Sequence, residues 1–341
     1  MTGGRFFEDY RVGEALVHAT PRTLTEGERA LYHAFYPARV ALTSSDAFAR
    51  DCGWEDGAPL DEMVVFHTVF GRSVPDVSLN AVANLGYAEG RVLRPVWPGE
   101  TLRAVSEVIG LKENSSGKTG IAWVRTTGLN QMDEPVLSFV RWVMVRKRDA
   151  DAPAPEPVVP ELAEAVAAED LVIPEGLDLR GYDPRLAGSF RRARDYAVGE
   201  LIAHPDGVTV EEAEHMMATR LWQNTAKVHF DATLREDGRR LVYGGHVISL
   251  ARALSFDGLE NACLVAGINA GTHANPCFAG TTVRAWSEVL DVVELREDVA
   301  AVRLRLVATD GSTEAGAVRG ADGKHLAGVL LDLDYWALMP A

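Results

Sequence analysis

The sequence predicts an α+β protein built from two copies of one domain, each a long curved antiparallel sheet wrapped round a buried central helix. The first observation behind this prediction is an internal repeat, because DYRVGE at 9–14 returns as DYAVGE at 195–200. The second is that each copy has one helix-length segment that is apolar on nearly all sides, followed by several apolar runs of strand length. A chain of 341 residues also has the usual size of two domains.

The repeat extends over most of each copy. GETLRAVSEV at 99–108 matches GTTVRAWSEV at 280–289, with the offset slipped by a few residues. We therefore divide the chain into a first copy at 1–148, a linker at 149–185 and a second copy at 186–341. Three further residue pairs keep the offset of the first match: His18 and His204, Thr23 and Thr209, Glu26 and Glu212.

The linker differs from both copies in composition. It holds six of the sixteen prolines of the chain and has a strong acidic bias. Such a composition is typical of a connection stiffened by proline. One short helix is expected inside it, around Glu161 to Ala168.

Helices are predicted at corresponding places in the two copies. A Thr-x-x-Glu pattern occurs at 23–26 and again at 209–212, and this pattern can satisfy the free N–H groups at a helix start. A helix of roughly three turns should follow each. Met63 to Val74 and Gly245 to Phe256 are apolar nearly all round, as expected for the buried central helix of each copy.

Apolar runs after each central helix predict long antiparallel strands. Turn signals such as NSSG at 114–117 and TDG at 309–311 separate them. The predicted strands are 102–109, 120–127 and 136–146 in the first copy, and 282–293, 300–308 and 326–336 in the second.

Composition excludes several classes of function. A formal net charge of −15, with no basic stripe, argues against nucleic acid as a partner. No window reaches the ~18 uninterrupted apolar residues of a membrane span, and the N-terminus lacks a signal-peptide pattern, so we expect a cytoplasmic protein with no membrane partner. Cys52, Cys263 and Cys277 lack the spacing of a zinc site or a disulfide framework, so we expect reduced structural thiols.

At this point the sequence resembles a known family. LVYGGHVISLARAL, followed by INAGTHANPCFAGTTVRAWSEV, is similar to the MaoC family of R-specific enoyl-CoA hydratases and dehydratases. The first copy has the matching LGYAEGRVLRPVWPGETLRAVSEV. More narrowly, SVPDVSLNAVANLGYAEG, WQNTAKVHFD and GGHVISLARALSFDGL resemble the mesaconyl-CoA hydratase branch, also called β-methylmalyl-CoA dehydratase.

The resemblance implies a fold, an activity and a ligand. The fold is a tandem, or double, hotdog. The activity is that of a hydro-lyase that interconverts mesaconyl-CoA and β-methylmalyl-CoA in the ethylmalonyl-CoA route. The alternatives are hydration of another enoyl-CoA, such as crotonyl-CoA or a longer R-3-hydroxyacyl chain, and a non-catalytic acyl-CoA-binding protein. The ligand is a small-molecule acyl-CoA thioester, and no glycine fingerprint of a nucleotide cofactor occurs, so no cofactor or metal is expected. A homodimer of double hotdogs is one expectation for the assembly.

The hydratase motif of the family, Gly-Asp-x-Asn-Pro-Leu-His-x-Asp, falls on QNTAKVHFD at 223–231. His229 and Asp231 match, whereas Asn224 replaces the acid. The resemblance therefore implies that His229 is the base and that Asn224 orients the water, because an amide hydrogen-bonds but does not take up a proton. Positions five apart on a continuous helix point about 140° away from each other, so the segment must break if both residues face one pocket.

Further site residues follow from the same resemblance. The N–H of Gly245, at the start of the central helix, would stabilise an enolate. The first copy has Asp61 and Glu62 there and no counterpart of His229, so we expect one live site, in the second copy. Plainer alternatives are a structural histidine, a helix-start glycine and solvated surface charges. The residues assigned to substrate binding are Lys227, for the free carboxylate of mesaconyl-CoA, Asp231, and Arg284, for the phosphates of CoA.

Overall fold

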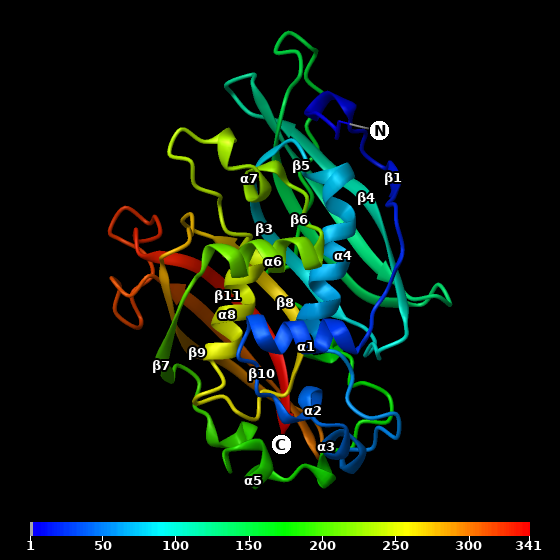
Figure 1. Ribbon diagram of the computed structural model, residues 1–341, viewed down its shortest axis with the longest axis vertical. Coiled ribbons are helices and arrows are strands. Elements are labelled where there is room, and N and C mark those ends of the chain that lie inside the picture. Colours follow the sequence, from blue (N-terminus) through cyan, green and yellow to red (C-terminus); the bar gives the residue numbers. More distant parts are fainter. Residues whose placement is uncertain (1–2) are drawn as a thin grey trace.

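Two halves, of six and five strands, form one continuous sheet in the computed structural model, which describes residues 3–341 (Figure 1). The strand order is β1-β4-β5-β6-β3-β8-β11-β10-β9-β7, and the short β2 pairs with β4 as an eleventh strand. The first-half strands are β1 (Ala15–Val17), β2 (Arg22–Thr23), β3 (Ala81–Val92), β4 (Thr101–Glu113), β5 (Thr119–Leu129) and β6 (Pro135–Arg146). The second-half strands are β7 (Leu201–Thr209), β8 (Leu264–His273), β9 (Thr282–Arg296), β10 (Val299–Thr309) and β11 (Val329–Pro340).

The longer helices cover one side of this sheet (Figure 1). The longer ones are α1 (Glu26–Phe35), α4 (Glu62–Val77), α6 (Glu212–Trp222) and α8 (Gly244–Leu254). The short ones are α2 (Ala41–Ser44), α3 (Asp46–Asp51), α5 (Pro184–Ala187) and α7 (Lys227–Phe230). Single 3-10 turns are η1 (Phe7–Asp9), η2 (Ala168–Asp170), η3 (Leu179–Gly181), η4 (Ala193–Asp195) and η5 (Ala232–Leu234).

The two predicted central helices are present as α4 and α8. Helix α4 contacts β4, β5 and β6, and α8 contacts β7, β9, β10 and β11. Their side chains are buried almost all round, as their apolar sequences require. Helix α6 contacts both of them and α1 (Figure 1), so one hydrophobic core runs through both halves.

The six predicted strands are confirmed as β4, β5, β6, β9, β10 and β11. In β4, for example, every second residue from Leu102 to Val108 is buried, which is the period of a strand with one covered face. Strands β3 and β8 were not predicted, because glycines interrupt their apolar pattern.

Those glycines let β3 and β8 pair and join the halves. In this antiparallel pair Tyr87 lies opposite Gly271 and Gly90 lies opposite Ile268. A Cβ on Gly90 would lie 2.8 Å from that of Ile268, and one on Gly271 would lie 2.9 Å from Cδ2 of Tyr87. The seam therefore needs residues without side chains at these two places.

The predicted capping boxes are wrong, although a helix follows each pattern. Helix α1 is capped by Thr25 with Glu28, two residues after the predicted pair, and α6 has Glu211 at its N-cap with no side-chain cap. The chain is still in β2 at Thr23 and in β7 at Thr209. Each threonine therefore hydrogen-bonds across strands instead of capping a helix.

The repeated residues make the same contacts in both halves. The hydroxyl pairs are Thr23 with Thr101 at 2.7 Å and Thr209 with Thr282 at 2.8 Å; the Nε2-to-hydroxyl contacts are His18 with Ser106 at 2.7 Å and His204 with Ser287 at 2.9 Å. These repeated residues therefore make structural contacts within each half rather than taking part in chemistry.

The linker packs against the sheet instead of forming the expected helix at 161–168. The backbone N–H of Val166 donates to Asn269 at 2.9 Å, and its carbonyl accepts from the indole of Trp336 at 2.9 Å. Val158 forms a bridge to Leu111 of β4. Backbone groups used in this way cannot also form helical hydrogen bonds. Within residues 3–341, no helix is long and apolar enough to cross a membrane.

Candidate active site

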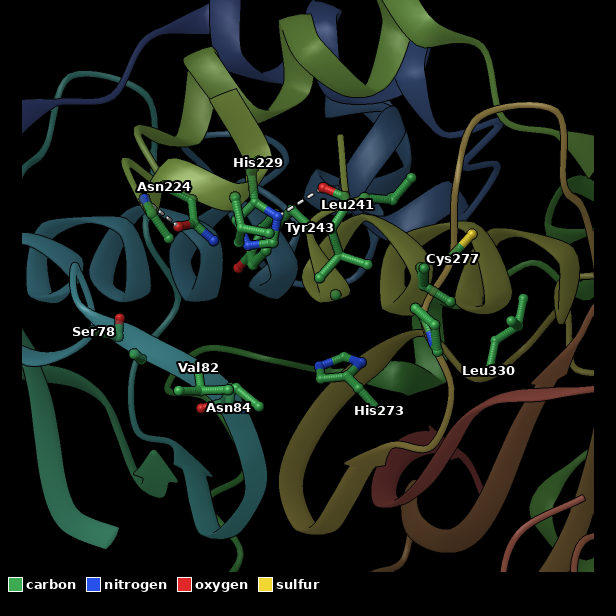
Figure 2. Close-up of a pocket in the computed structure, with 18 of the residues that line it drawn as sticks. Ser78, Val82, Asn84, Asn224, His229, Leu241, Tyr243, His273, Cys277 and Leu330 are labelled. Carbon is green, nitrogen blue, oxygen red and sulfur yellow. Dashed lines mark hydrogen bonds between the residues drawn. The ribbon is translucent and has the colours of Figure 1, made fainter. Parts of the chain in front are cut away.

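A cavity of about 280 Å³ lies at the seam between the halves, and both halves line it (Figure 2). The second half contributes Asn224 and His229, the start of α8, and His273 at the end of β8. The first half contributes Ser78 directly after α4, Asn84 and Tyr87 from β3, and Arg141 from β6. Asn224 and His229 lie on one side of the cavity, with Ser78 and Asn84 across from them (Figure 2).

The chain breaks between Asn224 and His229, as their joint use requires. Helix α6 ends at Trp222, Gln223 adopts the left-handed conformation with φ of 53°, and α7 begins only at Lys227. Both side chains can therefore face one cavity.

A close approach of two helices holds this break in place. Gly71 of α4 lies against the end of α6, where an added Cβ would be 1.8 Å from the carbonyl oxygen of Trp222. The next residue, Gln223, accepts a hydrogen bond from Arg72 of α4. Helix α4 of the first half thus positions Asn224 of the second.

The imidazole of His229 has a defined tautomer. Its Nδ1 lies 2.8 Å from the carbonyl oxygen of Leu241, which can only accept, so Nδ1 carries the proton and Nε2 keeps its lone pair. Burial lowers the pKa of His229 to about 4, so the ring is neutral at pH 7. A neutral ring with a free Nε2 can take a proton from water.

The buried amide of Asn224 is oriented by its own loop. Its Oδ1 accepts from the backbone N–H of Ala226 at 3.3 Å (Figure 2). The NH₂ group is then left to donate into the cavity. A water held there would lie between an amide donor and the region of His229.

The start of α8 supplies further hydrogen-bond donors, but the glycine that lines the cavity is Gly244 and not the expected Gly245. Gly244 lines the cavity, whereas Gly245 is buried behind it, and a Cβ on Gly245 would lie 2.5 Å from the Tyr243 hydroxyl. No side chain caps this helix among the residues described. The first N–H groups of a helix have no partner inside it, and the helix dipole favours negative charge there.

Three residues assigned to substrate binding do not reach the cavity. Lys227 and Arg284 are exposed and do not line it. Asp231 is exposed and caps η5, accepting from Thr233 N at 2.9 Å and Oγ1 at 2.6 Å, which lowers the pKa of this carboxyl. The single turn of α7 directs His229 inward, and Lys227, two residues earlier, therefore points outward.

The sequence alone did not indicate His273 or the cavity residues of the first half. Tyr87 Oη lies 3.1 Å from Nε2 of His273, and burial lowers the pKa of that histidine to about 4. These two residues meet only because β3 pairs with β8. The sequence does distinguish Arg141, because it is the one charged residue inside the apolar run VLSFVRWVMV.

The corresponding place in the first half is closed by an ion cluster. Asp61 caps α4, since its Oδ1 accepts from the backbone N–H of Met63 at 2.8 Å. Arg252 of α8 lies close to both acids, with Nη1 2.8 Å from Oδ2 of Asp61 and Nη2 3.7 Å from Oε2 of Glu62. Burial raises the pKa of Glu62. The space beside this cluster measures about 20 Å³, too little for an acyl group.

Metal ligation has no candidate group in the part of the chain that the structure describes, where no three His, Cys, Asp or Glu side chains gather around one point. Its three cysteines are free and buried. That the protein needs no cofactor remains a prediction from the sequence.

Comparison with known proteins agrees with this architecture. The family model described as mesaconyl-CoA hydratase matches residues 1–318. Mesaconyl-CoA hydratase from Cereibacter sphaeroides is 70% identical over 338 residues, covering 99% of this chain and 98% of that protein. Beta-methylmalyl-CoA dehydratase from Chloroflexus aurantiacus is 55% identical over 343 residues, covering 99% and 97%.

Solved structures confirm the double hotdog. A crystal structure from Chloroflexus aurantiacus, described as a MaoC domain protein dehydratase, has a TM-score of 0.97 and 54% identity, covering 100% of this chain and 98% of that one. A Mycobacterium tuberculosis protein described as having a double hotdog fold has a TM-score of 0.79 at 24% identity, covering 100% of both chains. The second likeness concerns the fold alone.

Proposed function

The chain belongs to the mesaconyl-CoA hydratase family, and we propose that it is a hydro-lyase whose reaction takes place in the cavity beside His229. The reaction is the reversible addition of water to the double bond of mesaconyl-CoA, which gives β-methylmalyl-CoA. One observation carries the assignment of the site. A neutral histidine with a free Nε2 shares a cavity with a buried amide and with an uncapped helix start.

Asn224 and His229 have separate roles in the addition of water. Asn224 holds a water through its NH₂ group, and Nε2 of His229 takes one proton as the water oxygen bonds to the β-carbon. The π electrons of the double bond move toward the thioester, whose oxygen becomes an enolate.

The enolate then collapses to product. N–H groups at the start of α8, where Gly244 lines the cavity, stabilise its negative oxygen, and one such donor is commonly worth about 3 kcal/mol of barrier. The α-carbon takes the proton back from His229, which returns to its neutral form. One water has been added, and the reverse sequence removes it.

Loss of enoyl-thioester absorbance tests this function. Wild type should consume mesaconyl-CoA, and His229→Ala should lower kcat by about 10²-fold to 10⁴-fold, the usual contribution of a general base. Full activity in His229→Ala would contradict the mechanism. Turnover of crotonyl-CoA alone would indicate a different enoyl substrate, and binding without turnover of either thioester would indicate a binding protein.

A further inference from the structure

Arg141 is a fully buried cation without a carboxylate partner among residues 3–341. Its side chain is 0% exposed. Nη1 donates to the hydroxyl of Ser78 at 3.2 Å and Nη2 to that of Ser73 at 2.7 Å, and the guanidinium lies 4.2 Å from the ring centroid of Phe70. Its Nε has no hydrogen-bond partner. Burial lowers its pKa to about 10, so it stays charged at neutral pH.

This arrangement costs stability, because a buried charge is normally paired. Arg252, the buried arginine of the other half, faces two carboxylates. The contacts of Arg141 are instead with the hydroxyl groups of Ser73 and Ser78 and with the ring of Phe70. A buried positive charge beside a cavity, with no protein anion, is suited to a ligand anion.

Two polar neighbours complete the arrangement. Both side-chain amide atoms of Asn84 are buried without a hydrogen-bond partner, and Asn84 lines the cavity. The hydroxyl oxygen of Ser78 accepts from Arg141, so the hydroxyl hydrogen is free to donate to a ligand. Ser78 and Asn84 lie across the cavity from Asn224 and His229 (Figure 2).

We propose that Ser78 and Asn84, backed by Arg141, form a subsite that binds the free carboxylate of the acyl group. This inference rests on the proposed function, in which the substrate is the thioester of an unsaturated dicarboxylic acid. That carboxylate is attached to the β-carbon, the atom that receives water. With the water beside Asn224 and His229, the carboxylate extends toward the opposite wall.

The first hotdog then has a function of its own. It carries no base, but it supplies the groups that distinguish a dicarboxylic from a monocarboxylic acyl chain. Arg141 acts as a positioning residue whose charge strengthens the donor at Ser78, and Lys227 is not needed for this recognition.

Unreactive thioesters test the subsite apart from catalysis. Methylsuccinyl-CoA has the carboxylate but no double bond, and 2-methylbutyryl-CoA has a methyl group in its place. By calorimetry, wild type should bind the first at least about 30-fold more tightly, the usual scale of a buried charged contact. In Arg141→Met this preference should fall to within about threefold, with the affinity for the neutral thioester unchanged.

Stability separates recognition from a structural role. Removing an unpaired buried charge should leave the Tm of Arg141→Met unchanged or raised, whereas loss of a structural arginine would lower the Tm and weaken both thioesters alike. Arg303→Met is the matched control, because Arg303 of β10 pairs with Asp334 at 2.6 Å and does not line the cavity. It should keep the preference. Asn84→Asp leaves Arg141 in place and should reduce the preference by about 10-fold through like-charge repulsion.

The outcomes distinguish the subsite from the function. No preference in wild type, or a preference that survives both Arg141→Met and Asn84→Asp, overturns the subsite even if mesaconyl-CoA is hydrated. A preference that is lost in these variants while mesaconyl-CoA is not hydrated supports the subsite and rejects the proposed function.

Discussion

The Nδ1 atom of His229 lies 2.8 Å from the carbonyl oxygen of Leu241, and this contact determines which ring nitrogen can act as a base. A carbonyl accepts a hydrogen bond but cannot donate one, so the proton of the neutral ring stays on Nδ1. The chain brings Leu241 here just before α8 starts. The base and the enolate donors are therefore fixed by one short segment.

The first prediction concerns the pH dependence of the reaction. A base works only when unprotonated, and burial lowers the pKa of His229 to about 4, so activity should be lost only as the pH falls toward that value. We expect kcat/KM for mesaconyl-CoA to stay flat between about pH 5.5 and 8. A histidine with an ordinary pKa would instead be half protonated near pH 6.5. The acid limb of kcat should lie at higher pH, because the anionic bound substrate stabilises the imidazolium. A limb near pH 6.5 in kcat/KM would contradict this, and the residual rate of His229→Ala is the control.

The second prediction is that Asn224→Asp impairs the enzyme, although it restores the acid of the wider family motif. Asn224 is buried in the cavity that we propose receives a carboxylate. Like charges held together in a buried site cost several kcal/mol, so kcat/KM for mesaconyl-CoA should fall by about 10-fold or more. Activity with crotonyl-CoA, which lacks that carboxylate, should fall less. Steady-state kinetics with both thioesters measure the difference. A rise with both would mean that an acid at this position works better than the amide.

Local patterns in the sequence predicted the parts of the fold that depend on local chemistry. Period-two burial in β4 and the all-round apolar pattern of α4 both follow from which face the core covers. The family resemblance assigned Asn224 and His229 to one site, and both residues line one cavity because the chain breaks between them. The contact between Tyr87 and His273 could not be predicted in this way, since it depends on β3 pairing with β8, 186 residues apart at that contact.

Lys227 and Arg284 are exposed and do not line the cavity. Contact of Arg284 with the phosphates of CoA stays a prediction. Arg141 was passed over as part of a strand. Its place inside an apolar run was the stronger indication, because burying an arginine is costly enough to need a reason.

The third prediction concerns Gly71, which lies far from Asn224 in sequence. An added Cβ would lie 1.8 Å from the carbonyl oxygen of Trp222, and backbone cannot yield as a flexible side chain can. Gly71→Ala should therefore displace residues 222–224 and lower kcat by about 100-fold, the usual cost of a misplacement of about 1 Å. Kinetics and thermal unfolding measure the two effects. Gly27→Ala is the matched control, because a Cβ on this helical glycine meets only the Thr25 hydroxyl, at 3.1 Å. Equal activity in both variants would show that α4 does not position Asn224.

The fourth prediction concerns the ion cluster that fills the first half. Arg252→Met leaves Asp61 and Glu62 buried without a cation, which should lower the free energy of unfolding by about 3–5 kcal/mol in urea titrations. In wild type and variant alike the free energy of unfolding should fall as the pH rises above the unfolded pKa of a glutamate, because burial raises the folded pKa of Glu62 and the unfolded state then binds fewer protons. The combination Arg252→Met, Asp61→Asn, Glu62→Gln removes the buried ionisable groups together and should recover much of the loss.

Turnover completes this test. The cluster does not line the cavity of His229, so folded Arg252→Met should hydrate mesaconyl-CoA at nearly the wild-type rate. A folded but inactive variant would mean that the start of α4 takes part in the reaction. Retained turnover with lowered stability would instead mean that the ion cluster serves stability and not the reaction. The first hotdog reaches the cavity of His229 at the opposite end of α4, where Ser78 lines it.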